Sequence, residues 1–168
     1  DVRWVIVYEG SSDGEEWLQW EWPCTITHEH SAPRFIAPYM PRKDHDLFYE
    51  SNGMGNGHNF MKLFGTGNPY RHTRSTPWHR IQARLLEGVI TPKGQRNATY
   101  DIFANNPFPD PTKPPQFVRC SLYMYEPSTM QEWTEEGRWW NVTHAGYNLP
   151  ACTLQQAQGT WNEWLSPP

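Results

Sequence analysis

Proline and glycine divide this chain into short segments. Sixteen of its 168 residues are proline and twelve are glycine, and the longest uninterrupted apolar run is Trp4–Tyr8. Because both residue types mark turns, we expect many short elements rather than long helices. A helix that crosses a bilayer needs about 20 apolar residues, so we expect no transmembrane segment in this chain. Membrane association would then come from partners or from a missing upstream region.

The aromatic content and the charge exclude two classes of protein. Ten Trp, eight Tyr and seven Phe residues are too many to leave in water, which argues against disorder. The formal net charge is −4 at pH 7, whereas a general nucleic-acid binder is normally strongly basic. We therefore expect an ordered protein with no nucleic-acid partner. We also expect a single domain over residues 1–150, followed by a C-terminal arm over 151–168.

The clearest alternation of side chains lies at residues 117–125. Val118, Cys120 and Leu122 fall on one face of this segment, which predicts a half-buried strand. Residues 2–8 are β-branched or aromatic on both faces, which indicates a strand covered on both sides. Further strands are predicted over 17–22, 34–39, 46–50 and 138–144, helices over 77–88 and 100–104, and an irregular insertion over 51–76.

The order of these elements indicates the fold class. Five or six short strands with one or two helices between them predict a mainly β chain with inserted helices, an α+β protein. We expect an antiparallel β-sandwich or a jelly-roll-like core. The helix over 77–88 has proline at its first position and glycine at its end, the usual asymmetry of helix termini.

Sequons and cysteines bear on the compartment. Asn97-Ala98-Thr99 and Asn141-Val142-Thr143 are N-glycosylation acceptors in secreted proteins. They predict glycans on Asn97 and Asn141 and a luminal or other extracytosolic compartment. Three cysteines, Cys24, Cys120 and Cys152, allow at most one internal disulfide, and the sequence does not decide which two would pair.

Few groups of residues in the sequence have the types and spacing of a metal or catalytic site. His28 and His30 are two residues apart, so on a strand their imidazoles would share one face and supply half of a metal site. Two further ligands would have to come from elsewhere in the chain. We therefore predict no catalytic residue, no cofactor and no enzymatic activity, with an uncharacterised metal-dependent activity as the alternative.

Two sequence features are candidates for contact with a partner. The strip over residues 71–84 contains four arginines, including Arg71 and Arg74, and no acidic residue. Such a strip suits phosphate, a sulfated glycan or an acidic partner. The chain also has more tryptophan than a core requires, and exposed indoles suit a protein or a sugar surface. The candidate exposed tryptophans are Trp139, Trp161 and Trp164.

Several local motifs follow one another in a specific order. They are Phe35-Ile36-Ala37-Pro38, Pro41-Arg42-Lys43-Asp44, Leu47-Phe48-Tyr49, the segment from Trp78 to Glu87-Gly88, Asn106-Pro107-Phe108-Pro109-Asp110, Pro114 to Arg119, Leu122-Tyr123 with Tyr125, and Gly137-Arg138-Trp139-Trp140. In this order the motifs resemble the soluble, lumen-facing C-terminal domain of the lipase maturation factors. The resemblance covers about residues 15–150.

The resemblance implies a non-catalytic scaffold. The family assists the folding of dimeric secretory lipases in the endoplasmic reticulum, so the implied partner is a client lipase. The motif residues read as structural, and Arg119 is expected to pair with Asp44. These residues are Arg42, Asp44, Asn106, Pro107, Phe108, Arg119, Tyr123 and Trp140.

The chain also departs from the family pattern. His45 stands where the family has tryptophan, and the segment over 51–76 is longer than the family's connection. A domain can be retained as a building block after its original task is lost. The alternatives are therefore an architectural accessory subunit of a larger membrane complex that has recruited this domain and, less favoured, a glycan-binding module.

Overall fold

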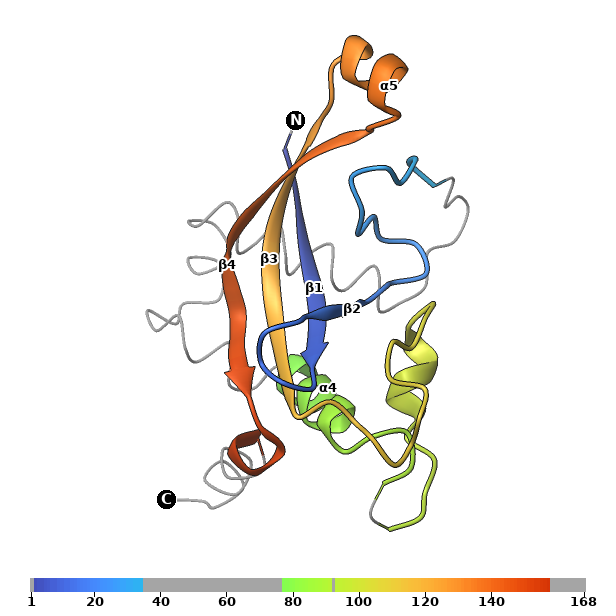
Figure 1. Cartoon of the computed structure of the whole chain (residues 1–168), viewed down its shortest axis with the longest axis vertical. Helices are drawn as coiled ribbons and strands as arrows, with labels where there is room; N and C mark the ends of the chain where they lie inside the picture. Colours follow the sequence, from blue (N-terminus) through green and yellow to red (C-terminus); the bar gives the residue numbers. More distant parts are fainter. Residues whose placement is uncertain (1, 35–76, 92, 158–168) are drawn as a thin grey trace.

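Four antiparallel strands form one sheet in the part of the chain that the structure describes. The computed structural model describes residues 2–34, 77–91 and 93–157. The strands lie in the order β2-β1-β3-β4 (Figure 1). In chain order the elements are β1 (Arg3–Ser11), β2 (Leu18–Trp20), α4 (Pro77–Leu86), the 3-10 helix η1 (Ala98–Ile102), β3 (Phe117–Pro127), α5 (Met130–Glu136) and β4 (Trp140–Cys152).

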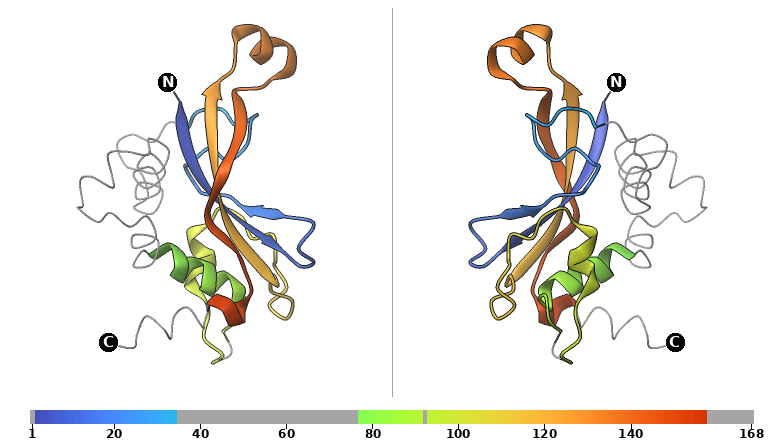
Figure 2. Two further views of the ribbon diagram at one scale, coloured as in Figure 1. Left: turned by 90° about the vertical axis from the view of Figure 1, so that its left-hand side faces the viewer. Right: turned by 90° about the vertical axis from the view of Figure 1, so that its right-hand side faces the viewer.

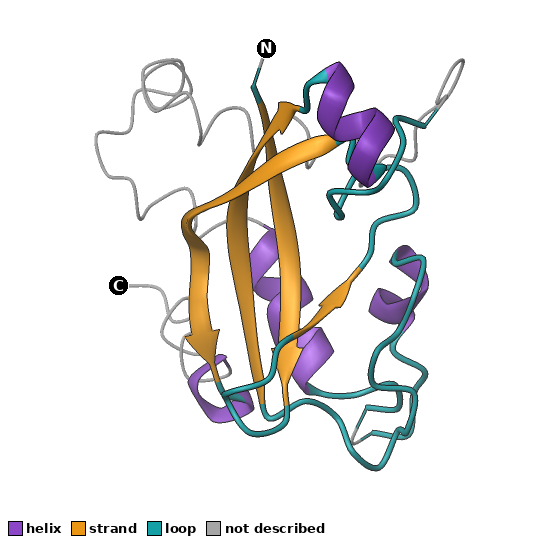
Figure 3. Ribbon diagram, turned by 45° about the horizontal axis from the view of Figure 1, so that its top comes forward, coloured by secondary structure: helices purple, strands orange, loops and turns teal. Residues whose placement is uncertain are grey.

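Strand β1 is covered on both faces, as its composition predicts. Ile6 and Tyr8 pack with α4 and η1 in the main core, whereas Val5 and Val7 pack against Ile26 on the opposite face. The exposed fraction of these four strand residues is at most 1%. Figure 3 shows α4 lying against one face of the sheet. The two sides of β1 are thus buried by a helix and by a loop.

The predictions for β3 and α4 are also confirmed. β3 extends two residues beyond the predicted strand, and Val118, Cys120 and Leu122 are buried together in the main core. α4 begins at Pro77 as expected, and Gly88 follows it with a φ of +82°. That left-handed conformation favours glycine and marks the helix end.

The main core is built around aromatic rings. Trp22 contacts Phe103 with ring centroids 4.6 Å apart, and Trp20 contacts Phe108 at 5.3 Å. Both indoles are at most 1% exposed. Rings in these tilted arrangements each contribute beyond their buried area, by roughly 0.5 to 1.5 kcal/mol. Aromatic burial on one face of the sheet is therefore a large part of what stabilises the fold.

A mainly β chain with inserted helices is confirmed, but the sandwich or jelly-roll arrangement is not. The described strands belong to one sheet, and one of its faces is covered by α4 and η1 rather than by a second sheet. The expected strands over 34–39 and 46–50 and the insertion over 51–76 lie outside the described residues, except for Arg34, which is not in a strand. Within the described part of the chain, no helix combines the length and the apolar character needed to cross a membrane.

Several element boundaries differ from their predictions. The strand expected over 17–22 is limited to β2, and the helix expected over 100–104 is the 3-10 helix η1. The last strand is longer than expected, and α5, which precedes it, was not predicted. Of the C-terminal arm, residues 151–152 belong to β4 and 154–157 form a helical turn, while 158–168 lie outside the described residues.

Gly10 marks a close approach between β1 and the aromatic core. A Cβ atom at this position would lie 2.6 Å from Cη2 of Trp20 and 2.7 Å from Cε2 of Phe108. Because both rings are buried, Gly10→Ala should force them apart and lower the free energy of unfolding by about 1 to 3 kcal/mol. Urea denaturation followed by tryptophan fluorescence measures this loss. A variant within 0.5 kcal/mol of the original chain would show that the rings have free space.

An apolar pocket at the end of the β3–β4 hairpin

The β3–β4 hairpin carries helix α5 at its end, beyond the body of the sheet (Figures 1 and 2). A capping box begins this helix: the Thr129 side chain accepts from the amide of Glu132, and the Glu132 carboxylate accepts from the amide of Thr129. The hydrogen bond from the Thr129 amide, with smaller contributions from neighbours, lowers the pKa of Glu132 below its usual range. Gly137 ends the helix in the left-handed conformation, with φ of +66°.

An arginine attaches α5 to the strand that follows it. The guanidinium of Arg138 lies 3.0 Å from the Glu132 carboxylate and 2.9 Å from that of Glu136. The Ser128 amide donates to the carbonyl of Trp139 at 3.0 Å, which closes the hairpin at the base of the helix. These contacts fix α5 against the start of β4.

The loop before residue 34 forms the other wall of the hairpin end. The backbone amides of Trp139 and Trp140 both donate to the carbonyl of Glu29, at 2.9 and 3.1 Å. The Trp140 indole donates to the carbonyl of Ser31 at 2.8 Å. Trp140 also packs with Tyr125 in the smaller core cluster, so it connects this region to the sheet.

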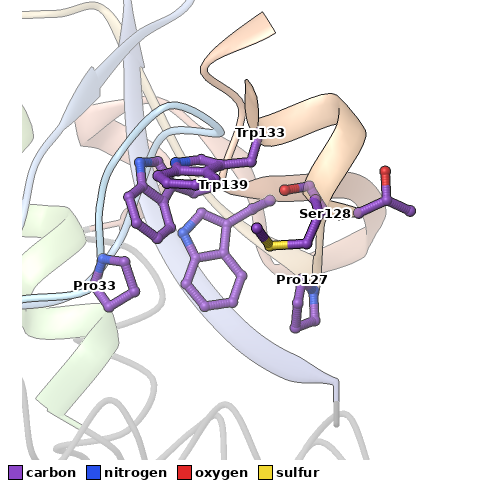
Figure 4. Close-up of a pocket in the computed structure, with 8 residues that line it drawn as sticks. Pro33, Pro127, Ser128, Trp133 and Trp139 are labelled. Carbon is purple, nitrogen blue, oxygen red and sulfur yellow. The ribbon is translucent and has the colours of Figure 1, made fainter. Parts of the chain in front are cut away.

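These elements line an open apolar pocket of about 340 Å³. Figure 4 shows tryptophan rings and prolines gathered around it. The side chains of Met130 and Trp133 are 72% and 39% exposed, and the rings of Trp133 and Trp139 lie 5.3 Å apart. We call this the tip pocket, and its lining residues are Pro33, Pro127, Ser128, Thr129, Met130, Trp133, Trp139 and Trp140.

The tip pocket is suited to binding apolar groups. Its two hydroxyls are already engaged, because Ser128 donates to the Arg138 carbonyl and Thr129 takes part in the capping box with Glu132. Exposed apolar side chains gathered in one place commonly mark a protein interaction site.

A polar cluster lies on the sheet away from this pocket. Glu9 on β1 accepts hydrogen bonds from three β3 side chains: Arg119 Nε at 2.6 Å, Ser121 Oγ at 2.5 Å and Tyr123 OH at 3.0 Å. Burial, together with the nearby Glu9 charge, raises the pKa of Tyr123 to about 12. Among the described residues, the ion-pair partner of Arg119 is Glu9, whereas the expected partner Asp44 lies outside the described residues.

The Asn-Pro-Phe motif forms a turn that inserts a ring into the core. The side-chain oxygen Oδ1 of Asn106 accepts from the Phe108 amide at 3.0 Å, and the side-chain nitrogen Nδ2 donates to the Phe108 carbonyl at 3.0 Å. Pro107 lies between them, and Phe108 is only 7% exposed. Other candidate residues lie outside the described part of the chain: Arg42, Asp44, Arg71, Arg74, Trp161 and Trp164.

The two histidines do not occupy a strand face. They lie in an irregular segment, and each has its own neighbours. His28 contacts Gln19 at 2.8 Å and Glu21 at 3.0 Å, whereas His30 approaches the Gly137 carbonyl at 3.3 Å. Among the described residues, no three His, Cys, Asp or Glu side chains are placed to hold a metal ion together.

The three cysteines lie in different surroundings. Cys120 is buried on β3 and Cys152 is half-buried at the end of β4, while Cys24 is half-buried in the segment after β2. Burial raises the pKa of the Cys152 thiol to about 11. This thiol is therefore protonated at neutral pH and a poor nucleophile.

The two sequons differ in accessibility, and the expected glycan on Asn97 conflicts with the fold. Asn97 is 4% exposed, and its amide group donates to the carbonyls of Arg84 and Gly88. A glycan on that nitrogen would remove at least one of these two hydrogen bonds, because it replaces one of the two amide hydrogens. Asn141 on β4 is half-buried, and its amide group makes only a 3.4 Å contact with Glu132.

The tip pocket brings together residues that sequence reasoning found and residues that it missed. Trp139 and Trp140 were candidates, whereas Pro33, Met130 and Trp133 were not. The missed signal is the spacing of Thr129 and Glu132, a capping box that predicts a helix start at Met130, three residues before Trp133.

Comparison with known proteins supports the resemblance found in the motifs. Lipase maturation factor 2 of Mus musculus is 26% identical over 153 residues, which is 89% of this chain and 18% of that protein. The Homo sapiens protein is 27% identical over 153 residues, and the Gallus gallus protein 25% over 154, with the same coverage. The chain is thus similar to lipase maturation factors, and it spans less than a fifth of the length of these curated relatives. No protein-family model and no solved structure matches it.

Proposed function

We propose that this chain is a non-catalytic protein-binding domain that assists the maturation of secretory lipases. The observation that carries the proposal is the similarity to lipase maturation factor 2 along nearly the whole chain. The tip pocket supports it, because it presents exposed apolar side chains that already have a rigid support. In this proposal the client lipase contacts Met130 and Trp133 while its own apolar surface is still exposed.

We place the domain in the lumen of the endoplasmic reticulum. Secretory lipases fold in that compartment, and the sequon at Asn141 is consistent with passage through it. The Asn141 side chain lies near the hairpin end, where its neighbours Thr143 and His144 are exposed. A glycan there would leave the sheet toward solvent.

Removing the Trp133 ring should weaken partner binding at least about tenfold. Truncation of an aromatic residue at the centre of an interface commonly costs about 2 kcal/mol or more. The measurement is recovery of a dimeric secretory lipase, crosslinked in the endoplasmic reticulum of cells that express the tagged full chain or its Trp133→Ala variant. The matched control is Ile90→Ser, since Ile90 is also an exposed apolar residue, at 51%, but lies outside the pocket.

Two outcomes would contradict the proposal. The contact surface is wrong if Trp133→Ala and Ile90→Ser recover the same amount of lipase as the original chain. The lipase role is wrong if the original chain recovers no lipase. Equimolar recovery of one stable membrane complex in its place would favour the architectural subunit. Thermal unfolding of both variants checks that each retains its fold.

A further inference from the structure

The hairpin end that forms the tip pocket is strongly acidic. Residues 126–140 contain the carboxylates of Glu126, Glu132, Glu135 and Glu136 and a single guanidinium, that of Arg138. Their net charge is −3 over fifteen residues, in a chain whose formal net charge is −4. The apolar pocket therefore lies in a part of the described structure with a net negative charge.

Part of this charge has no internal cation to balance it. Arg138 is engaged by Glu132 and Glu136. Glu135 is exposed and accepts only from the neutral amide of Gln131, and Glu126 is exposed near the end of β3. Neither of these two carboxylates has an ion-pair partner among the described residues.

The described part of the adjoining loop contains one arginine, and its guanidinium is already hydrogen-bonded. Arg34, which follows the pocket residue Pro33, donates to the carbonyl of Pro23. It is offset in the same loop by Glu29, whose carboxylate lies 3.3 Å from His30. The described residues on the loop side of the pocket therefore add no net positive charge to the hairpin end.

We propose that the tip pocket receives an exposed partner segment in which an apolar side chain is flanked by Lys or Arg. This inference rests on the proposed protein-binding function and specifies the chemistry of the partner. The apolar side chain enters the pocket beside Trp133 and Trp139, and the flanking cations are attracted by the uncompensated charges of Glu126 and Glu135. A cation held over an exposed indole gains further attraction from the ring, which the Trp133 ring offers here.

Size and charge each restrict the occupant. A volume of about 340 Å³ lies at the lower end of the range, about 300 to 1,000 Å³, of pockets that bury small ligands, so the pocket accommodates one or two side chains. An acidic segment would be repelled by carboxylates that have no counter-charge. A neutral apolar segment would gain only the burial of its side chain. Electrostatic complementarity thus selects the basic segment and increases its rate of association.

Three labelled peptides test this proposal against the full chain. Fluorescence anisotropy would compare Gly-Lys-Phe-Leu-Arg-Gly with a version carrying Glu at both basic positions and a version carrying Ala at both apolar positions. The basic apolar peptide should bind at least tenfold more tightly than either of the others. Raising the salt concentration from 50 to 500 mM should remove most of its advantage over the acidic peptide, because salt screens exposed charges.

Charge-reversal variants assign the effect to the hairpin end. Glu126→Lys combined with Glu135→Lys should abolish the preference for the basic peptide. The matched control is Glu15→Lys combined with Glu16→Lys, two exposed carboxylates in the turn between β1 and β2, at the other end of β1. This control pair should leave the preference unchanged.

Failure of this inference is distinguishable from failure of the proposed function. Equal binding of the basic and acidic peptides, or binding of none, overturns the inference, and so does a preference that survives Glu126→Lys with Glu135→Lys. Self-association through the hairpin end without peptide binding also overturns it. If lipase recovery still depends on Trp133 in any of these cases, the protein-binding function stands and only the charge requirement is wrong.

Discussion

Arg119→Met is expected to lower the free energy of unfolding by about 3 to 5 kcal/mol, the usual cost of leaving one buried charge of an ion pair without its partner. The Glu9 side chain is 9% exposed and that of Arg119 is 19% exposed, so water does little to replace the lost guanidinium. The guanidinium also lies 3.9 Å from the ring of Trp17, and that contact is lost as well. Urea denaturation at pH 7, followed by tryptophan fluorescence, measures the difference.

A double variant separates the charge from the packing. Glu9→Gln removes the carboxylate charge and keeps an acceptor for Ser121 and Tyr123. Combined with Arg119→Met, it should recover a large part of the lost stability, since replacing both members of a buried pair is often nearly neutral. A loss below 1 kcal/mol for Arg119→Met alone would mean that Glu9 is satisfied by its two hydroxyl donors. A double variant no more stable than Arg119→Met alone would attribute the loss to packing.

The partner of Arg119 shows that sequence periodicity predicts a strand and its faces but not the register of its pairing. The alternation over 117–125 correctly predicted β3 and placed Arg119 on its polar face. The identity of the partner depends on register, and Glu9 lies directly opposite Arg119 in the β1–β3 pairing. Register between strands more than one hundred residues apart is set by the assembled core and the connecting turns. A single sequence carries no local signal for it.

The same limit explains the fold class. The composition of β1 predicted a strand buried on both faces, which is correct, and a second sheet was the expected cover. One face is covered by α4 and η1, and the other is packed against Ile26 from an irregular segment. Burial of a strand face indicates that something lies on it, and helix, loop and sheet all satisfy that requirement.

For the tip pocket, the sequence identified Trp139 and Trp140 and missed the exposed helix residues Met130 and Trp133. Trp139 and Trp140 stand in a recognisable motif and an expected strand. Met130 and Trp133 belong to a seven-residue helix with no buried residue, so it has no continuous apolar face to reveal it. Only the capping box predicts this helix. A helix this short has little stability of its own without tertiary contacts, so its local sequence signal is weak.

Asn97→Asp is expected to lower the free energy of unfolding by about 2 to 4 kcal/mol. The Asn97 amide group is the donor for two carbonyls at the end of α4, those of Arg84 and Gly88, and helix ends leave such carbonyls without intrahelical partners. Aspartate places an acceptor where both carbonyls need a donor, and each buried polar group left unsatisfied costs about 1 to 3 kcal/mol. The negative end of the helix dipole adds to the repulsion. Thermal and urea unfolding measure the loss.

Asn141→Asp is the matched control, because Asn141 stands in the other sequon but is only half-buried with one long contact. Its effect should be smaller, at most about 1 kcal/mol, because the new carboxylate faces that of Glu132 across a single long and half-buried contact. The same burial predicts that folded chain from a secretory host carries a glycan on Asn141 and none on Asn97. Intact-mass measurement before and after deglycosidase treatment detects these glycans. It is applied to the original chain and to Asn141→Gln. A glycan on Asn97 of folded chain, or equal stability losses for the two aspartate variants, would mean that Asn97 does not hold the end of α4.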